Sequence, residues 1–317
     1  MSTEQPLHLI LDTDPGIDDA LALLLALASP EVSLEAVTTV SGNVPLTQTT
    51  RNARALLALA GRQDIPVAAG AERPLVRPPI HAADVHGPSG LGRAELAEPA
   101  SPARAATKAP ILISERIKAA PGTITLVAIG PLTNLALAVR MDPEIAQQVR
   151  EVVIMGGALR VPGNVTPAAE FNIYADPEAA HIVFHAGWPL RLVSLDTTQQ
   201  VGLTRAQFTP LCRPESLIGR SIEAMLAHYF EDFAPRAGYE RFHLHDPLAL
   251  AAAFRPELLR WEPVYVDVEL SGSQTAGATI AWFRRRSQTP PPNVLAATAV
   301  DIEGFTTFFL ERLARLL

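Results

Sequence analysis

Several features of secreted and membrane proteins are missing from this sequence. It contains one cysteine, Cys212, which excludes an internal disulfide framework and fits a reducing cytoplasm. No stretch approaches about 18 uninterrupted apolar residues, so a membrane span is not expected. The opening MSTEQPLHLILD lacks the basic and apolar segments of a signal peptide. We therefore expect a cytoplasmic protein without a membrane partner.

Positive charge is also scarce. The 317 residues include 26 Lys and Arg against 33 Asp and Glu, a formal net charge of −7. This balance gives no electrostatic basis for binding nucleic acid or an anionic membrane surface. The glycine patterns of dinucleotide-binding folds and of P-loops are missing as well. Any nucleotide-like ligand should therefore be small and uncharged.

No linker divides the chain into separate domains. Two proline-rich stretches, at 74–88 and 290–292, are short and lie between apolar segments that are typical of regular structure. We interpret both as loops inside a domain. A single domain over residues 1–317 is expected, because this length is ample to bury one large core.

Short apolar runs alternate with helical patterns along the chain. The runs are rich in β-branched residues and apolar on both faces, as buried parallel strands are, and they cover residues 7–11, 34–40, 124–129, 151–155 and 190–195. The stretches between them predict helices at 18–28, 45–60, 131–140 and 176–186, and residues 203–260 are expected to be mostly helical. The alternation predicts an α/β fold with a mostly parallel, Rossmann-like open sheet flanked by helices. Ligands of such folds bind at the carboxyl ends of the strands, where the polar clusters of this sequence fall.

Four carboxylates occur within eight residues at the end of the first predicted strand, in the segment DTDPGIDD (12–19). Like charges this close repel one another unless a cation lies among them. Capping of the following helix would explain Asp18 and Asp19, but not all four acids. An EF-hand is a poor match, since Leu23 stands where a bidentate Glu is needed. A metal site is the favoured interpretation.

A second acid-bearing segment, HDPLA at 245–249, opens another helical pattern far along the chain. Alone it is more typical of a capped helix with a surface histidine. For the first segment, a haloacid-dehalogenase phosphatase is an open alternative, because that family also begins with D-x-D after a strand. Its usual next residues are Gly-Thr, where this chain has Pro15 and Gly16.

Taken together, these segments resemble the inosine-uridine-preferring nucleoside hydrolases. The similar motifs stand in the family's order and span residues 12–250: DTDPGIDDA (12–20), Gly42-Asn43, VHGPSGLG (85–92), VAIGPLTN (127–134), IMGG (154–157), GNVTPAAEFN (163–172) and HDPLAL (245–250). Residues 251–317 carry no diagnostic motif. The resemblance implies an N-glycosidase that cleaves ribonucleosides into ribose and a free nucleobase.

The resemblance also implies the residues of the site. Ca²⁺ would be the cofactor, bound by Asp14, Asp19, Asp246 and the backbone carbonyl of Ile129, an all-oxygen shell of the kind this hard cation prefers. The lack of clustered Cys and His ligands speaks against zinc there. Asp12 would orient the other acids. The ribose would be held by Asp18, Asn43, Met155, Asn164, Glu170 and Asn172, and the base side would be formed by His86, Tyr229 and Phe233. Without the resemblance, His86 is more typical of a structural or exposed loop histidine, and the two aromatic residues of a core.

The same resemblance assigns the chemical roles. Asp14 would be the general base toward water, and His245 the acid that protonates the leaving base. His86 and His245 resemble the non-specific and pyrimidine-preferring members, whereas the three tryptophans lie outside the motifs where a purine-specific site would place them: Trp188, Trp261 and Trp282. A purine-only enzyme is therefore less expected.

Two further expectations concern assembly and turnover. Related proteins are often dimers or tetramers, so a homodimer or homotetramer is expected. A calcium-dependent protein that binds nucleosides or sugars without turnover is a second alternative, although binding alone would need neither Asp14 nor His245.

Overall fold

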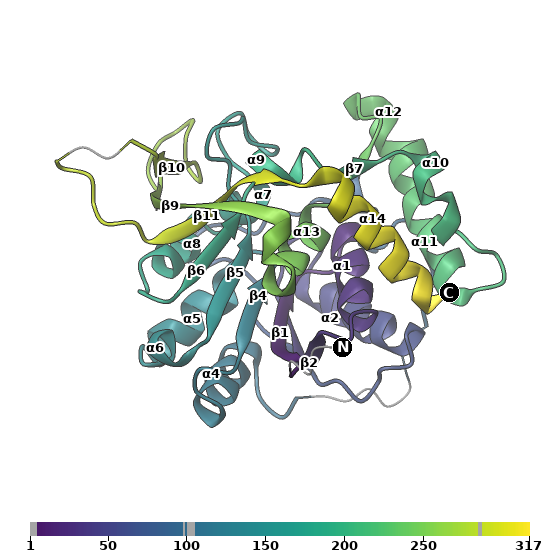
Figure 1. Ribbon diagram of the computed structural model, residues 1–317, viewed down its shortest axis with the longest axis horizontal. Coiled ribbons are helices and arrows are strands. Elements are labelled where there is room, and N and C mark those ends of the chain that lie inside the picture. The colour runs from purple at the N-terminus through teal and green to yellow at the C-terminus, as the bar shows by residue number, and fades with distance from the viewer. Residues whose placement is uncertain (1–4, 98, 100–104, 285–286) are drawn as a thin grey trace.

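One central sheet organises the protein. The computed structural model describes residues 5–97, 99, 105–284 and 287–317, and within these ranges nine strands form this sheet in the order β10-β9-β11-β6-β5-β4-β1-β2-β3 (Figure 1). The strands are β1 (Leu7–Thr13), β2 (Val32–Thr39), β3 (Val67–Ala69), β4 (Thr125–Ala128), β5 (Glu151–Met155), β6 (Leu190–Val193), β9 (Leu259–Val268), β10 (Thr279–Trp282) and β11 (Val294–Val300). Neighbours from β11 to β3 are parallel, whereas β9 runs antiparallel to both β10 and β11. The predicted α/β fold with a mostly parallel sheet is confirmed.

Helices cover both faces of the sheet. On one face lie α1 (Ile17–Leu27), α2 (Leu46–Leu59), α11 (Leu217–Ala227), α13 (His245–Phe254) and α14 (Ile302–Leu313), and on the other lie α4 (Ala109–Ala119), α5 (Thr133–Met141), α6 (Ile145–Gln148) and α8 (Pro177–Phe184). Shorter helices are α3 (Ala83–His86), α7 (Phe171–Ala175), α9 (Leu195–Thr198), α10 (Arg205–Phe208) and α12 (Ala234–Ala237). The π-helix His228–Phe233 continues α11, and a small ladder joins β7 (Gly202–Leu203) to β8 (Phe242–His243). The layers form a three-layer sandwich.

Strand β1 illustrates why these residues form a buried strand. Successive side chains of a strand point to opposite faces, so Leu9 and Leu11 enter the core beneath α1 and α13, while Ile10 enters the core beneath α4 and α5. All three side chains are fully buried. An apolar run without alternation is therefore what a strand between two helical layers requires.

The predicted elements are found close to their expected positions. The five strands and four helices predicted for residues 7–195 are all present, and residues 203–260 are mostly helical as expected. The prediction of a loop over 74–88 is wrong in part, because residues 83–86 form α3. Strands β3, β9, β10 and β11 were not predicted. The expected single domain of residues 1–317 also includes positions outside the described residues.

The strand order places a crevice beside β1. The chain runs from β1 outward to β2 and β3, then returns to the other side of β1 for β4, β5 and β6. The direction of winding thus changes between β1 and β4, and in open α/β sheets ligands bind at the carboxyl ends of strands at such a point. The carboxyl ends of β1, β2, β4 and β5 carry the predicted site motifs.

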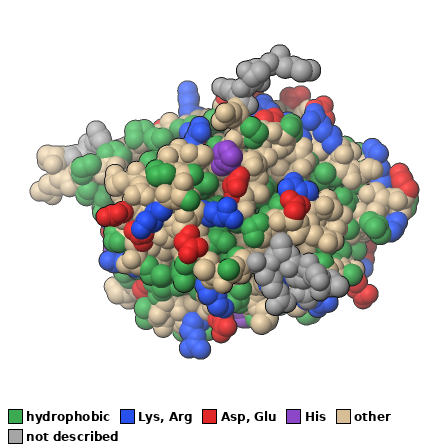
Figure 2. Space-filling model, turned by 90° about the horizontal axis from the view of Figure 1, so that it is seen from below, with side chains coloured by type: hydrophobic (Ala, Val, Ile, Leu, Met, Phe, Trp, Pro, Cys, Tyr) green, Lys and Arg blue, Asp and Glu red, His purple; other side chains and the backbone are tan. Residues whose placement is uncertain are grey.

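One face of the protein carries charges of both signs. On the face drawn in Figure 2, acidic and basic side chains are interspersed, and hydrophobic ones lie between them. Among the described residues, no helix is long and apolar enough to cross a membrane.

Candidate active site

A cavity of about 810 Å³ opens at the carboxyl edge of the sheet. Of the predicted site residues, twelve line it: Asp18, Asn43, His86, Ile129, Met155, Asn164, Glu170, Asn172, Tyr229, Phe233, His245 and Asp246. Asp14 and Asp19 do not line the cavity but lie buried against the residues that do. A volume of this size suits a small organic ligand.

Three carboxylates meet at the floor of this cavity. One oxygen from each of Asp18, Asp19 and Asp246 lies within 4.8 Å of the other two. Asp18 and Asp19 stand in the first turn of α1, which begins directly after β1, and Asp246 stands in the first turn of α13, which packs on α1. The site therefore depends on the contact between these two helices.

Asp19 is held by the turn between β1 and α1. Its Oδ1 accepts a hydrogen bond from Thr13 Oγ1 at 2.5 Å, and its Oδ2 accepts from the backbone N–H of Gly16 at 2.9 Å. Asn43 Nδ2 donates to the same Oδ2 at 3.0 Å. Both oxygens are thus fixed before any ligand binds.

Asp14 lies in a tight cradle with one unsatisfied oxygen. Its Oδ2 accepts the backbone N–H of Asn43 at 2.6 Å, but Oδ1 is buried and makes no hydrogen bond within the described residues. A Cβ added to Gly42 or to Gly130 would collide with this carboxylate. Glycine at both positions lets the backbone approach, and an orphaned buried oxygen of this kind fits a ligand that the protein itself does not supply.

Burial and mutual repulsion disfavour the charged forms of these acids. Burial, aided by the charge of Asp19, raises the pKa of Asp18 to about 8 and the pKa of Asp14 well above its usual value. The pKa of Asp246 is raised by burial and by the charges of Asp18 and Asp19, and the pKa of Asp19 is raised by burial. No Lys or Arg is among the cavity-lining residues that the structure describes. A bound cation would lower these pKa values and favour the charged carboxylates. The donor set contains only oxygen atoms, which fits a hard divalent ion.

Asp12 contacts a different set of residues. Its Oδ1 accepts hydrogen bonds from Thr38 Oγ1 at 2.5 Å and from Asn134 Nδ2 at 2.8 Å, and burial raises its pKa to about 7. These contacts join β1 to β2 and to the start of α5. Asp12 therefore braces the sheet edge beneath the site.

Amide and acid side chains form one wall of the cavity. Glu170 precedes α7, and its carboxylate accepts the backbone N–H groups of Asn172 at 2.9 Å and Gly157 at 2.9 Å. Asn172 Nδ2 donates to the carbonyl of Ile129 at 2.9 Å, and Asn164 Oδ1 accepts the N–H of Phe171 at 2.9 Å. Three of the predicted ribose-binding residues, Asn164, Glu170 and Asn172, thus line the cavity with side chains held by hydrogen bonds.

Histidines and aromatic rings form another part of the cavity lining, the aromatic wall. His86 Nδ1 accepts the backbone N–H of Ile17 at 3.1 Å, so one of its nitrogens serves the start of α1 and the ring also lines the cavity. His245 Nδ1 lies 2.7 Å from Thr198 Oγ1. Burial lowers the pKa of both histidines to about 3. The rings of Tyr229 and Phe233 lie 5.4 Å apart, and Tyr229 Oη donates to the carbonyl of Arg241 at 3.0 Å.

Several functional residues were not identified from the sequence. Thr198 orients His245, and Tyr239, Phe242 and His243 complete the aromatic wall. These residues stand in no recognisable motif, because their spacing along the chain reflects the fold and not a local turn. The three tryptophans do not line the cavity, as expected from their positions.

Residues 9–307 match the family model described as inosine-uridine preferring nucleoside hydrolase. The chain belongs to this family, and it is an N-glycosidase with a small-molecule nucleoside substrate. This membership favours the hydrolase over the phosphatase alternative.

Related proteins match over nearly their whole lengths. The inosine-uridine preferring nucleoside hydrolase of Crithidia fasciculata is 39% identical over 98% of this chain and 98% of its own. The pyrimidine-specific ribonucleoside hydrolase of Enterobacter sp. is also 39% identical, over 98% of both chains. The solved structure of a purine-preferring ribonucleoside hydrolase from Gardnerella vaginalis has a TM-score of 0.92 at 33% identity, covering 98% of each chain. These relatives differ in base preference.

Proposed function

We propose that this enzyme hydrolyses the N-glycosidic bond of ribonucleosides with the help of Ca²⁺ held by Asp14, Asp19, Asp246 and the carbonyl of Ile129. The observation that carries the proposal is the orphaned Asp14 Oδ1 beside a buried group of like-charged acids. Calcium would offset their repulsion and lower the pKa of a bound water. With the cation present, all of these carboxylates stay ionised.

The residues around the metal divide the chemical work. Asp14 accepts the proton of the attacking water as general base. Asp18 and Asn43 bind hydroxyls on one side of the ribose, while Met155, Asn164, Glu170 and Asn172 hold its other side. The ionised acids near the sugar also stabilise the positive charge that develops on the ribosyl group.

His245 serves the leaving base. Burial lowers the pKa of this imidazole. To act as an acid the ring must carry its second proton as the imidazolium, a form that ionised carboxylates nearby favour. Nδ1 lies 2.7 Å from the Thr198 hydroxyl, a contact that would hold the ring so that the hydrogen on Nε2 serves the departing base. His86, Tyr229 and Phe233 contact the base. With no tryptophan in the cavity, a non-specific or pyrimidine-preferring enzyme is favoured over a purine-only one.

Release of ribose tests the function. Purified enzyme in calcium buffer should produce free ribose from inosine and uridine, with adenosine and cytidine completing the screen of base preference. 2′-Deoxyuridine should react roughly 10⁴-fold more slowly in kcat/KM than uridine, since a site built around a hydroxyl rejects substrates that lack it. Equal values for the two pyrimidine nucleosides would contradict the ribose contacts. Stoichiometric zinc in place of calcium at the carboxylate floor would contradict the metal assignment.

We further propose that the enzyme acts in the cytoplasm as a homodimer or homotetramer in the salvage of purine and pyrimidine bases. The single cysteine supports the compartment, and light scattering would give the assembly.

A further inference from the structure

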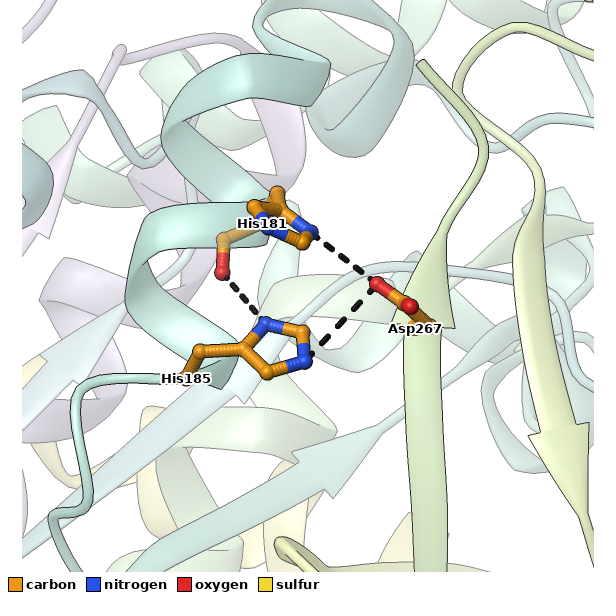
Figure 3. Close-up of side chains that lie close together, drawn as sticks. All are labelled: His181, His185 and Asp267. Carbon is orange, nitrogen blue, oxygen red and sulfur yellow. Dashed lines mark hydrogen bonds and ion pairs between the residues drawn. The ribbon is translucent and has the colours of Figure 1, made fainter. Parts of the chain in front are cut away.

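A second cluster of metal-ligating side chains lies outside the active-site cavity, where α8 meets β9. His181 and His185 stand four residues apart at the end of α8 and so share one side of the helix, and Asp267 reaches them from β9 (Figure 3). One ligand atom from each of the three lies within 4.8 Å of the others. None of the three lines the cavity.

The distances in this cluster match those between the ligands of a small divalent ion. Asp267 Oδ1 lies 3.0 Å from His181 Nδ1 and 3.8 Å from His185 Nε2. Ligand atoms around a tetrahedral zinc ion, with bonds of about 2.0 to 2.1 Å, stand roughly 3.3 to 3.4 Å apart. Shifts of a few tenths of an ångström would bring both pairs to that separation.

The hydrogen bond of His185 fixes which nitrogen is free to bind a metal. His185 Nδ1 lies 2.8 Å from the carbonyl oxygen of His181, and since a carbonyl only accepts, Nδ1 carries the hydrogen. The neutral ring then presents the lone pair of Nε2 on the side of the Asp267 carboxylate. A carbonyl partner on the second nitrogen is how zinc-bound histidines are commonly held.

The surroundings also favour a cation. The cluster lies at the carboxyl end of α8, where the helix dipole attracts positive charge. The three side chains are 33% to 40% exposed, which leaves room for water to complete the coordination. Tyr265 Oη lies 3.2 Å from His185 Nε2 and can donate a hydrogen bond to the metal-free ring.

We propose that His181, His185 and Asp267 form a second metal site, for a divalent ion of the zinc class, that ties α8 to β9. Two imidazoles and one carboxylate suit zinc, whereas calcium prefers oxygen ligands. The helix α8 directly follows α7, which carries Asn172 of the sugar wall. A metal at this position would therefore link α8, the helix after the sugar-wall residue Asn172, to β9 in the antiparallel part of the sheet.

Zinc binding by the whole protein tests this proposal. Isothermal titration with Zn²⁺ alone is carried out in excess Ca²⁺, which occupies the carboxylate floor, and without nucleoside. The native protein should bind one more zinc ion per chain than the double variant His181→Gln/His185→Gln. Zinc should also raise the melting temperature of the native protein more than that of the variant, because it joins two elements in the folded state only. Asp267→Asn should weaken the binding.

A matched control is available on β1, away from this cluster. His8 is 41% exposed, and its Nδ1 lies 2.7 Å from Glu35 Oε1. Among the described residues, this histidine–acid pair belongs to no group of three possible metal ligands. His8→Gln should keep the additional zinc ion. Equal zinc binding and equal zinc-induced melting shifts in the native protein and the double variant would overturn the proposal and leave a histidine–aspartate ion pair. Ribose release in calcium should be the same in the double variant, so this result does not depend on the proposed catalytic mechanism.

Discussion

At the scale of single residues, the position of Asp14 depends on what its neighbours lack. Gly42 and Gly130 have no Cβ, and the Asp14 carboxylate occupies the space that a Cβ at either position would fill. The backbone N–H of Asn43 holds one oxygen, and the other has no partner within the described residues. Such a group is already ordered when a ligand arrives, so little conformational entropy is lost on binding.

Replacing Asp14 by Asn should lower kcat for uridine by about 10² to 10⁴-fold, the usual effect of losing a general base. Steady-state ribose release measures the loss of the general base, and metal analysis measures any loss of bound calcium. Asp12→Asn is the matched control, because Asp12 is an equally buried acid two residues away whose oxygen contacts an amide can imitate. An Asp14→Asn variant with normal turnover and full calcium content would show that another group is the base.

Replacing His245 by Ala should have an effect that depends on the leaving group. With inosine or uridine the loss should be about 10² to 10⁴-fold, as for lost general acid catalysis. With p-nitrophenyl riboside it should be far smaller, because that phenolate leaves without a proton. Thr198→Val, which removes the hydroxyl beside Nδ1, should reproduce the same selectivity more weakly. Parallel losses on both substrates would mean that His245 shapes the site and donates no proton.

The sequence was most informative where acids cluster locally. DTDPGIDD predicted a metal site because four carboxylates in eight residues are hard to explain otherwise, and two of its acids, Asp18 and Asp19, lie in a cluster that could hold an ion. The cavity includes most of the residues that the resemblance implied. Thr198 and His243 could not be found in this way. Nor could the pairing of His181 and His185 with Asp267, since the third ligand comes from a distant strand.

At the scale of elements, a two-pronged ion pair adds to the apolar packing that holds the C-terminal helix α14. Arg312 of α14 donates to both oxygens of Glu31, at 2.5 and 2.9 Å, and its side chain is 8% exposed. Glu31 lies in the turn between α1 and β2. This pair therefore joins the last helix to the first helical layer.

Arg312→Ala should lower the free energy of unfolding by about 1 to 2 kcal/mol, a value reduced because Glu31 is 40% exposed and screened by water. The hydrogen bond from Arg312 holds the pKa of Glu31 below its usual 4.5. The stabilisation is therefore present above pH 4.5 and is lost as the pH falls through the lower folded-state pKa. Urea unfolding of the native protein, Arg312→Ala, Glu31→Ala and the double variant at neutral and acidic pH measures it. An Arg312–Glu31 interaction energy that is the same at neutral and at acidic pH would contradict the role of the ionised Glu31 in this pair.

Elements without a distinctive pattern were the ones missed. Strand β3 has three residues, too few for a periodicity. Strand β9 contains Pro263 together with Arg260, Glu262 and Asp267, so it does not form the uninterrupted apolar run that revealed β1 and β5. It lies in the antiparallel part of the sheet, where one face can be more exposed. Its place became visible only through its pairing with β10 and β11.

At the scale of the whole molecule, the proposed calcium site predicts that metal binding stabilises the folded protein. Calcium that binds the folded form only should stabilise it by about 2.7 kcal/mol at one hundred times its dissociation constant. Melting temperatures measured in calcium and after removal of metal with a chelator should differ by several degrees. Asp246→Asn should respond much less to calcium. A melting temperature that is the same with and without the ion in the native protein would contradict a structural coupling of this kind.

The general architecture was predictable because strand and helix patterns alternate so regularly from residue 7 to residue 195. That alternation restricts the topology to a parallel sheet with right-handed crossovers. The strand order could not be predicted from the sequence, because it depends on whether the strand after β3 is added beside β3 or on the other side of β1. The cavity beside β1 follows from that choice.

The contact between α1 and α13 has a consequence for the newly made protein. A ribosome that adds about 5 to 20 residues per second reaches Asp246 roughly 10 to 50 seconds after Asp14. During that interval the acids of the DTDPGIDD segment have been made, but the helix that carries Asp246, the last of the proposed ligands along the chain, has not. The nascent chain should thus be unable to bind calcium tightly or to cleave nucleosides, and activity should begin only after most of the polypeptide has left the ribosome.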